Sequence, residues 1–558
     1  MRSPRTGLSV LVAAVLALSA CTSSESGGEP AASTAPVTVT YAHEQEFQSY
    51  NNNTSEQSSV GNAVVLNQVL RGFYYYSPQG EVAPDDEFGT FTKVSDNPLT
   101  VKYTVDPKAV WSDGAPIECS DFVLTWAAQS GKWPAFQANG NAGYDLARMP
   151  QCNPGDKSFT VVFNTPFADW NSLFGDGEVL PAHVVERESG VPDLIAALKA
   201  DDEAKIKKVA SFWFSGWVFK PGQYDAAVSP SAGPYEVSAW EAGQSITLTA
   251  NPKWWGTPPQ AKNIVIRFIQ QDQQAQALQN GEIQVMDPQP NPELLGQLDK
   301  LGASATVTTN DRLDWEHLDV NYTRMFKDAA VREAFAKCIP RQTIVDNLIK
   351  PLNPQAQVLE SRQLLPFQKG YATLAATGGQ AYDTVDIPGA KKLLADAGRT
   401  GLKVTIGYQT PNPRRASEVD LIRDSCAKAG FTIKDGGAPD FFDHMTKGDF
   451  DVALFAWSGT ALVSQNQSIY AADGGTNFTG YDNAEVTAWL KQLNGTLDER
   501  QQLALQQKIE TQLWKDLATI PLFAFPGVLA VAKNVQGVQF NASNNGLTWN
   551  ADRWSLAG

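Results

Sequence analysis

Short apolar runs lie between longer runs in which apolar residues recur every three or four positions. The short runs predict β-strands, and the longer ones predict amphipathic helices. The predicted strands are Val37–Tyr41, Leu99–Val105, Ser158–Phe163, Ser245–Ala250, Asn263–Ile269, Leu402–Tyr408 and Asp451–Trp457. The predicted helices are Asp121–Ala128, Asp272–Asn280, Asp328–Cys338, Pro388–Ala397, Ser417–Ala429 and Asp498–Leu517. Because the two kinds alternate along the chain, the pattern predicts an α/β fold with sheets of mixed direction.

Several predicted helices carry end signals. Ser417 followed by Asp420 resembles a capping box, which predicts a helix start at Ser417. Gly430 and Gly398 follow two of the helices, where glycine readily adopts the left-handed conformation of a helix end.

The first residues predict export and anchoring. Arg2 and Arg5 precede the apolar run Leu8–Ala20, which is too short to span a bilayer and is typical of a secretory signal. Leu18-Ser19-Ala20-Cys21 resembles the bacterial lipobox, so we expect cleavage before Cys21 and lipidation of that cysteine. A plain signal peptide with an incidental cysteine is the alternative. The small, polar residues 22–36 then predict a flexible tether.

Four further cysteines, an even number, favour disulfides in an exported protein. They are Cys119, Cys152, Cys338 and Cys426. Three connectivities are possible, and proximity along the chain favours Cys119–Cys152 and Cys338–Cys426. Helical spacing supports the second pair, because each of its cysteines shares a face with apolar residues of its helix.

Composition excludes some partners. The chain has 558 residues, 42% of them apolar, and a formal net charge of −16. The length predicts more than one domain. Since no basic cluster interrupts the acidic balance, nucleic acid and anionic membrane surfaces are not expected partners. After the signal no run reaches 18 apolar residues, the length expected of a membrane span.

A series of short motifs then appears in order along the chain. They are Trp111-Ser112-Asp113-Gly114 with Pro116, Asp121-Phe122-Val123 with Thr125-Trp126, Ser231–Tyr235, Asn251–Trp255, Leu278–Ile283, Phe326–Phe335, Ala390–Gly398 and Asn477–Tyr481. Together they resemble the solute-binding proteins of peptide-type ABC importers, the large oligopeptide, dipeptide and nickel binders. The resemblance extends from Val37 to Val538.

The resemblance implies two lobes that close on a ligand, with an extra subdomain in the first lobe. The expected segments are the signal (1–20), the tether (21–36), the first lobe (37–59, 191–310 and 521–558), its subdomain (60–190) and the second lobe (311–520). The chain would cross between lobes at Leu313–Asn321 and Ile520–Phe525, which would act as the hinge. A monomer that delivers its solute to the permease and ATPase of the importer, outside the cytoplasmic membrane, is the expected assembly.

Peptides in this family are held as an added extended strand. The resemblance places ligand contacts just after the first strand, at the end of the strand Asp451–Trp457 and near the second crossing. The aromatic run 212–217 adds one more candidate. The expected ligand-binding residues are Glu46, Phe47, Gln48, Tyr50, Asn51, Trp217, Trp457, Ser458, Gly459, Thr460, Phe523 and Phe525. For each aromatic residue, packing in the core is the alternative.

One position departs from the family pattern. Peptide binders commonly carry Trp-x-x-Asp, whose aspartate pairs with the ligand ammonium, and here Thr460 stands at that position. Because an unpaired buried ammonium is costly, either Glu46 replaces the acid or the ligand has no free amino group there. Arg362 is expected to be an exposed loop residue rather than a partner for a ligand carboxylate.

Catalytic and metal-binding motifs are not found in the sequence. His43, His183, His317 and His444 are far apart, and no hydrolase signature is present. We therefore expect no enzyme activity, no cofactor and no metal site. Besides a peptide binder, the sequence leaves open an oligosaccharide, glutathione-like or metal-chelate binder, a sensor lipoprotein without transport, and a secreted hydrolase.

Overall fold

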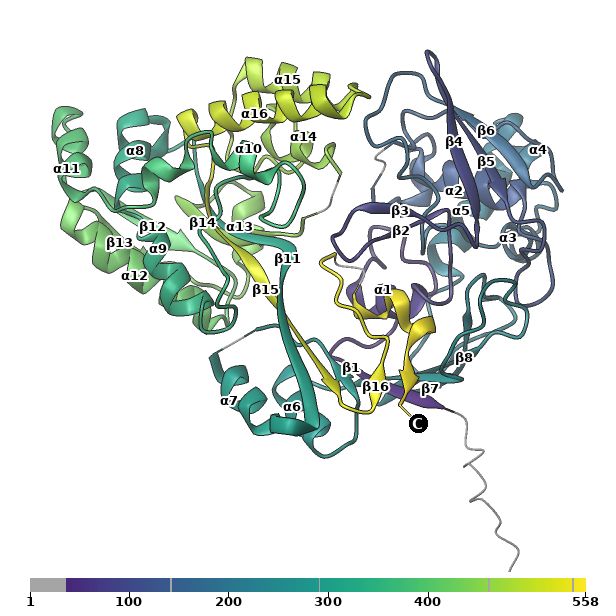
Figure 1. Cartoon of the computed structure of the whole chain (residues 1–558). Helices are drawn as coiled ribbons and strands as arrows, with labels where there is room; N and C mark the ends of the chain where they lie inside the picture. Colours follow the sequence, from purple (N-terminus) through teal and green to yellow (C-terminus); the bar gives the residue numbers. More distant parts are fainter. Residues whose placement is uncertain (1–36, 141–142, 291, 460–461, 544–545, 558) are drawn as a thin grey trace, which may run out of the picture. The chain divides into compact units, whose positions relative to one another are not determined.

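One ten-stranded sheet connects the two halves of the protein (Figure 1). The computed structural model describes residues 37–140, 143–290, 292–459, 462–543 and 546–557, so Cys21 and Thr460 lie outside the described residues. The strand order is β13-β12-β14-β11-β15-β10-β1-β9-β8-β7. The strands are β1 (Thr38–His43), β7 (Tyr235–Glu241), β8 (Ser245–Ala250), β9 (Asn263–Phe268), β10 (Val285–Met286), β11 (Ala305–Val320), β12 (Lys403–Gly407), β13 (Thr432–Asp435), β14 (Val452–Trp457) and β15 (Ile520–Ala532). Because parallel and antiparallel pairs both occur, the predicted mixed α/β class is confirmed.

The central pair of strands, β11 and β15, runs through both halves. It is antiparallel from Ala305 opposite Ala532 to Leu318 opposite Ile520, with register shifts between Asp311 and Trp315 and between Glu316 and His317. The two segments expected to form the hinge are therefore mostly hydrogen-bonded strands. We keep the names first lobe (37–59, 191–310 and 521–558), subdomain (60–190) and second lobe (311–520) for the ranges predicted above.

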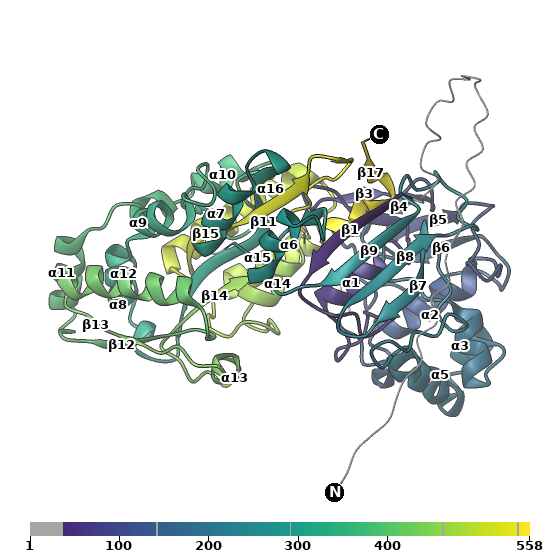
Figure 2. The same cartoon turned by 90° about the horizontal axis from the view of Figure 1, so that it is seen from below.

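The subdomain and the first lobe share one hydrophobic core. Val39 of β1 and Trp111 of the subdomain belong to the same buried cluster. Figure 2 shows β7, β8, β9 and β1 side by side, with helices of the subdomain next to them. The helices from the start of the chain are α1 (Val60–Leu66), α2 (Cys119–Gln129), α3 (Ala182–Ser189), α4 (Leu194–Lys199), α5 (Glu203–Ser215), α6 (Gln271–Gln279) and α7 (Pro292–Leu301). The small sheets are β2 (Tyr74–Tyr76) with β3 (Val82–Pro84), β4 (Gly89–Asp96) with β5 (Leu99–Val105) and β6 (Ser158–Val162), and β16 (Val535–Gln536) with β17 (Ser555–Leu556).

The second lobe has a separate main core. It is built by β11–β15 and the helices around them, and residues from Leu318 to Phe523 belong to it. Its helices are α8 (Ala329–Cys338), α9 (Arg341–Ile344), α10 (Tyr371–Ala375), α11 (Ile387–Asp396), α12 (Pro413–Ala429), α13 (Phe441–Thr446), α14 (Gln465–Tyr470), α15 (Ala484–Asn494) and α16 (Glu499–Asp516). The main core of the second lobe is thus separate from the core that the first lobe shares with its subdomain.

Both expected disulfides are present in the structure. Cys119 at the start of α2 is bonded to Cys152, and Cys338 of α8 is bonded to Cys426 of α12. Cys338 and Cys426 have no exposed surface, in agreement with the shared helix face predicted from their spacing.

Helix α12 begins earlier than predicted. Asn412 is its N-cap, and its side chain accepts a hydrogen bond from the Arg415 N–H at 3.0 Å. Pro413 follows at the first helical position, where its missing N–H costs nothing. The predicted cap at Ser417 was wrong, because the Ser417 hydroxyl donates to the Pro413 carbonyl one turn back within the helix.

Arg362 is buried, and its expected exposure was wrong. The guanidinium donates to Glu510 Oε1 at 2.6 Å and to Thr519 Oγ1 at 2.8 Å, and it lies over the Trp514 ring at 4.0 Å. Arg362 and Glu510 each have fully buried side chains. A loop arginine with these partners anchors its loop to α16 rather than facing solvent.

In the part of the chain that the structure describes, no helix is long and apolar enough to cross a membrane.

Candidate ligand-binding cleft

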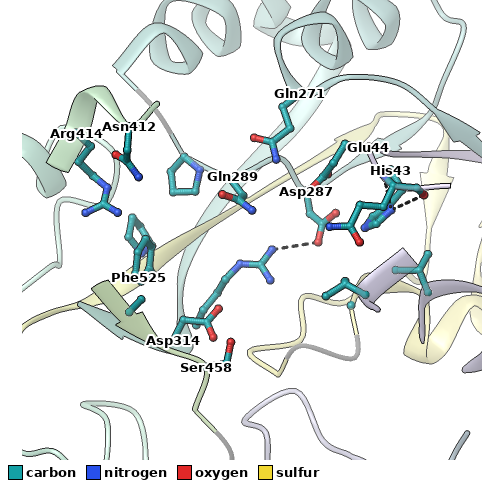
Figure 3. A pocket seen from close by; sticks show the side chains of 18 of the residues that line it. His43, Glu44, Gln271, Asp287, Gln289, Asp314, Asn412, Arg414, Ser458 and Phe525 are labelled. Carbon is teal, nitrogen blue, oxygen red and sulfur yellow. Dashed lines mark hydrogen bonds and ion pairs between the residues drawn. The ribbon is translucent and has the colours of Figure 1, made fainter. Parts of the chain in front are cut away.

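A cavity of about 680 Å³ lies where strand ends of both lobes meet (Figure 3). The first lobe contributes the segments after β1 and β10, and the second lobe contributes the turn before α12 and the end of β14. The middle parts of β11 and β15 cross between them. The lining residues are Tyr41, His43, Glu44, Gln45, Val60, Val64, Gln271, Asp287, Gln289, Pro290, Arg312, Asp314, Pro411, Asn412, Pro413, Arg414, Arg415, Ala456, Ser458, Phe525, Pro526 and Gly546. Crevices at the carboxyl ends of strands are common ligand sites in α/β proteins.

An ion pair fixes the first-lobe wall. Arg312 Nη2 lies 3.1 Å from Asp287 Oδ2, and the Tyr41 hydroxyl donates to Asp287 Oδ1 at 2.5 Å. Burial, with Asp287 next in effect, raises the pKa of Tyr41 well above its usual value, so the phenol stays a donor. Because Arg312 comes from β11 and Asp287 from the segment after β10, the pair joins the central strand to this wall.

Arg414 and Arg415 of α12 line the second-lobe wall, and the buried carboxyls of Glu316 and Glu418 lie behind them. Arg415 Nε donates to Glu316 Oε1 at 2.6 Å, and Arg414 Nη2 lies 3.3 Å from Glu316 Oε2. Arg414 also bonds Glu418 one turn along α12. The Arg414 guanidinium lies over the Phe525 ring at 4.7 Å, so Phe525 supports it at the cavity surface.

Burial affects the two carboxyls of this cluster differently. The side chains of Glu316 and Glu418 have no exposed surface. Burial alone would raise the pKa of Glu316, but Arg414 and Arg415 outweigh it and hold the pKa below its usual range. For Glu418 burial dominates over Arg414 and raises the pKa to about 8. At neutral pH the cluster therefore combines two guanidiniums with one ionised carboxylate and one neutral carboxyl.

Two of the expected ligand-binding residues, Ser458 and Phe525, line this cavity. Phe47, Tyr50, Trp217 and Phe523 lie in the hydrophobic cores with no exposed surface. Their burial fits the packing alternative stated for each aromatic residue.

The segment after β1 makes its polar contacts within the first lobe. The Tyr50 N–H donates to the Trp217 carbonyl at 3.1 Å, and the Asn51 side chain donates to the Trp213 carbonyl at 2.8 Å. The backbone at Gln48, whose side chain is exposed, accepts from the Phe219 N–H at 3.1 Å. These main-chain groups are thus already paired within the protein.

Glu46 also points away from the cavity. It accepts from Trp240 Nε1 at 2.9 Å and from the Gly243 N–H at 2.8 Å, both at the β7–β8 hairpin. The lining residue Glu44, two positions earlier, is the acidic group of this segment that faces the cavity (Figure 3).

Trp457 packs beside the sheet. Its ring is stacked with Phe478 at 6.0 Å and with His317 at 6.0 Å. Its strand neighbours Ala456 and Ser458 line the cavity, and alternation along β14 directs the Trp457 side chain to the opposite face. Gly459 follows in close contact with the central strand, because a Cβ at that position would lie 2.1 Å from the Leu313 carbonyl oxygen. A side chain therefore does not fit there.

Most of the charged residues that line the cavity could not be predicted from the sequence. Glu316 and Arg414 are 98 positions apart, and Asp287 and Arg312 are 25 apart, so no local pattern could pair them. One local signal was available. Asn412-Pro413 is a strong helix start, and it places Arg414 in the first turn.

A second set of contacts links the subdomain to the second lobe. The Asp169 carboxylate accepts from the Val463 N–H at 3.2 Å and from the Ser464 N–H at 3.0 Å, and the Ala168 N–H donates to the Asn494 carbonyl at 2.7 Å. These bonds connect the two parts independently of the central strands.

Comparisons with known proteins agree with this architecture. Residues 79–479 match the model of the bacterial extracellular solute-binding proteins, family 5 (middle). Lipoprotein Rv2585c of Mycobacterium tuberculosis is 31% identical, over 99% of this chain and 97% of its own length. Oligopeptide-binding protein OppA of the same species is 28% identical, over 84% of this chain and 76% of its own length.

Two solved structures share the fold. The periplasmic EDTA-binding protein EppA superposes with a TM-score of 0.82 at 22% identity, covering 94% of this chain and 98% of its own. The oligopeptide-binding protein AppA of Bacillus subtilis, solved with a nonapeptide, gives a TM-score of 0.71 at 18% identity, covering 94% of this chain and 100% of its own. The chain therefore belongs to the family 5 bacterial extracellular solute-binding proteins, two-lobed components of ABC importers that bind solutes and are not enzymes.

Proposed function

We propose that the protein captures peptides or peptide-like solutes in this cleft, outside the cytoplasmic membrane, and delivers them to the permease and ATPase of its importer. The volume supports a small solute, because about 680 Å³ falls in the range of roughly 300–1,000 Å³ typical of such sites. The relatives named as oligopeptide-binding proteins are consistent with this solute class.

The observation that carries the proposal is the edge of β14 beside the cavity. β14 pairs with β12 only through Val452 and Ala453, whereas it pairs with β11 along its whole length. Among the described strands, none therefore pairs with the part of β14 after Ala453 on the β12 side, where Ala456 lines the cavity. An extended peptide can add as a strand at such an edge, and its main-chain hydrogen bonds would provide affinity without sequence selectivity.

The charged groups of the cavity suit the two ends of a peptide. Glu44 lines it just after β1, Asp314 lines it from β11, and Arg414 lines it from the first turn of α12 (Figure 3). Because Glu46 is bound to the β7–β8 hairpin, we propose that Glu44 supplies the acid that Thr460 lacks. A peptide ammonium near Glu44 would then be paired, which offsets the cost of burying it.

Capture would proceed by closure of the lobes. We propose that the first lobe with its subdomain and the second lobe, with the boundaries predicted above, move as two bodies. The central strands would bend at the register shift between Asp311 and Trp315. Solute that contacts both walls favours the closed state, because closure adds contacts that the open state lacks. The bonds of Asp169 to Val463 and Ser464 would form at the same time.

A ligand panel tests the proposal. Protein purified without added solute is screened by thermal shift against alanine peptides of two to five residues, the same peptides with N-methylated amides, and oligosaccharides. We expect stabilisation by the plain peptides, because a ligand of the native state raises its stability, and less by the methylated ones, which have lost main-chain donors. Stabilisation by an oligosaccharide alone would contradict the peptide assignment. Mass spectrometry of co-purified solute gives an independent answer.

Two substitutions locate the acidic partner. Glu44→Gln is expected to weaken binding of a peptide with a free amino end, whereas Glu46→Gln, the matched control, is expected to leave it unchanged. Weaker binding in Glu46→Gln, with unchanged binding in Glu44→Gln, would make Glu46 the partner of the peptide ammonium. N-acetylated peptides are expected to bind both variants equally.

A metal chelate is a second candidate solute. It is favoured by the likeness to the EDTA-binding protein EppA and by Arg312, Arg414 and Arg415 in the lining, since guanidinium groups pair well with carboxylates. Adding metal-loaded and metal-free EDTA to the panel distinguishes this candidate from peptides.

We further propose that Cys21 is lipidated and holds the protein at the outer face of the membrane as a monomer. The relatives named as lipoproteins support an anchor. Cys21→Ala is expected to release the protein into the medium or periplasm. A strain that lacks the permease distinguishes transport from sensing, because loss of solute uptake without loss of signalling would indicate a sensor.

A further inference from the structure

A second cavity, of about 620 Å³, lies on the first-lobe half of the central strands. None of the described residues that line it lines the cleft. It is bounded by β11, the last part of β15, the segment 533–540 and the loop residues Pro78 and Gln79, and we call it the outer groove. We propose that the outer groove binds a single-chain carboxylate, a molecule with one apolar tail and one carboxylate, such as a medium-chain fatty acid. This site is separate from the proposed peptide site, and neither depends on the other.

The floor of the outer groove is one face of the paired strands β11 and β15. Thr306 lies opposite Val531 and Thr308 lies opposite Leu529, and the side chains of directly opposed residues project to the same face. The other face, which carries Ala530, belongs to the cluster that includes α6 and α7. The floor therefore presents a row of aliphatic side chains beside a row of hydroxyls. The volume of about 620 Å³ falls in the range of roughly 300–1,000 Å³ typical of small-molecule sites.

An apolar wall faces this floor. Val535 is buried, and Val538 and Phe540 are half-buried. Phe540 packs on the backbone of Gly527, where a Cβ would lie 2.3 Å from its ring. The Arg312 guanidinium, which lines the cleft, lies over the same ring at 5.5 Å. This pair lies between the two cavities, so an apolar tail in the outer groove would end at Phe540.

Lys533 supplies the charge of the groove. Among the described lining residues it is the only charged one. Its side chain is exposed, and Nζ donates to Thr306 Oγ1 at 2.9 Å. An ammonium has three donors, so this contact leaves donors for a carboxylate. Because no described acidic residue lines the groove, in a chain of net charge −16, the local charge favours an anion over a cation.

The charge and the apolar wall mark opposite ends of the groove. Lys533 directly follows β15 and is bonded to Thr306. Phe540 stands over Gly527, which pairs with Asn310. Thr306 and Asn310 are four residues apart, which is about 13 Å along a strand. A carboxylate at Lys533 would therefore direct its tail over the aliphatic row toward Phe540, and a tail longer than the groove would gain no further contact.

Calorimetric titration with simple amphiphiles tests the proposal. The protein carries Cys21→Ala, so that no lipid anchor requires detergent, and every probe is kept below its micelle concentration. The probes are hexanoate, decanoate, tetradecanoate, decanol and decylammonium. Each CH₂ group that becomes buried strengthens binding about two- to fourfold, so decanoate is expected to bind at least about tenfold more tightly than hexanoate. Tetradecanoate is expected to bind about as tightly as decanoate, decanol more weakly, and decylammonium more weakly still.

Two matched tryptophan variants locate the site. Thr308→Trp fills the groove from its floor and is expected to weaken decanoate binding at least about tenfold, because the tail loses its buried surface. Val307→Trp adds the same ring to the opposite face of β11, where Val307 is 39% exposed, and is expected to leave binding unchanged. Val538→Asp, which places a negative charge in the apolar wall, is the second variant if Thr308→Trp fails to fold.

Lys533→Gln tests the carboxylate. Loss of a partly exposed ion pair is expected to weaken decanoate binding about two- to fivefold and to leave decanol binding unchanged. The matched control is Lys300→Gln, which removes an exposed lysine of α7 that does not line the groove, and neither probe is expected to respond to it. The difference between wild type and Lys533→Gln is expected to disappear at about 1 M salt, because salt screens an exposed pair.

The outcomes are distinct. Failure of decanoate to bind overturns the proposal, and so does unchanged affinity in Thr308→Trp, or in Val538→Asp if the first variant does not fold. Equal binding of decanoate and decylammonium, or an equal effect of Lys533→Gln on decanoate and decanol, overturns the carboxylate assignment. Competition between decanoate and an alanine peptide would place both in one site and overturn the outer groove. Binding of phosphatidylglycerol vesicles that is lost in Thr308→Trp, without binding of decanoate, would assign the groove to a lipid surface instead. Loss of decanoate binding leaves peptide capture unaffected, because the ligand panel measures it separately.

Discussion

Trp457→Ala is expected to destabilise the fold more than it weakens ligand binding. The indole contacts the rings of His317, Phe455 and Phe478, with centroids 6.0, 5.0 and 6.0 Å away. Truncating a buried tryptophan costs about 3–5 kcal/mol, and Trp457 is only half-buried. Its Nε1 is buried without a partner among the described residues, and removing it recovers about 1 kcal/mol. The expected loss of unfolding free energy is therefore about 2–3 kcal/mol.

Urea unfolding followed by far-UV circular dichroism measures this loss without relying on tryptophan fluorescence. The control is Trp457→Phe, which keeps the stacked ring and is expected to cost about 1 kcal/mol or less. Affinity for a peptide that binds the wild type should stay within about threefold, less than 1 kcal/mol. Unchanged unfolding with affinity weakened tenfold or more would refute the placement of Trp457 away from the cavity. It would return Trp457 to the ligand site expected from the sequence.

Three further substitutions test contacts outside the cavity. Arg362→Met is expected to cost about 3–5 kcal/mol in urea unfolding, because it leaves the Glu510 charge buried and unpaired, and the additional change Glu510→Gln should recover part of this. Replacing Cys338 and Cys426 by alanine opens a link across 88 positions, with an expected cost of about 4–5 kcal/mol in the same assay. Asp169→Ala should speed hydrogen exchange at the amides of α14 and leave the second-lobe core protected. An unchanged free energy of unfolding for either of the first two, or unchanged hydrogen exchange for Asp169→Ala, would show that the contact is not maintained in solution.

Local pattern was sufficient for strands with clear alternation. The strands Leu99–Val105 and Ser245–Ala250 have the predicted bounds, because their alternation is clear and turn residues end them. The start of α12 was misplaced because two cap signals compete, and Asn412-Pro413 outweighs Ser417. The sequence predicts chain crossings and not a strand pair at β11 and β15, because the paired residues lie about 200 positions apart in the chain.

The candidate site depended on contacts that no local pattern specifies. The expected aromatic residues Phe47, Tyr50 and Trp217 are apolar enough to suit either a ligand or a core, and only tertiary packing decides between them. Arg362 shows the same ambiguity for a charge, because Glu510 is 148 positions away. The sequence identifies these residues as candidates for a site, but it does not show which groups they contact.

The sequence by itself determined the family, the mixed α/β class, the favoured cysteine pairs and the expected lipidation at Cys21. These depend on short motifs, on periodicity and on spacing, which are properties of neighbouring residues. Only the tertiary structure decided which groups face the cavity, with Glu44 rather than Glu46 in its lining and Arg414 beside Phe525. It also decided the environment of Glu418, because burial and the distance to other charges set the pKa of a carboxyl, and both arise only when distant segments pack together.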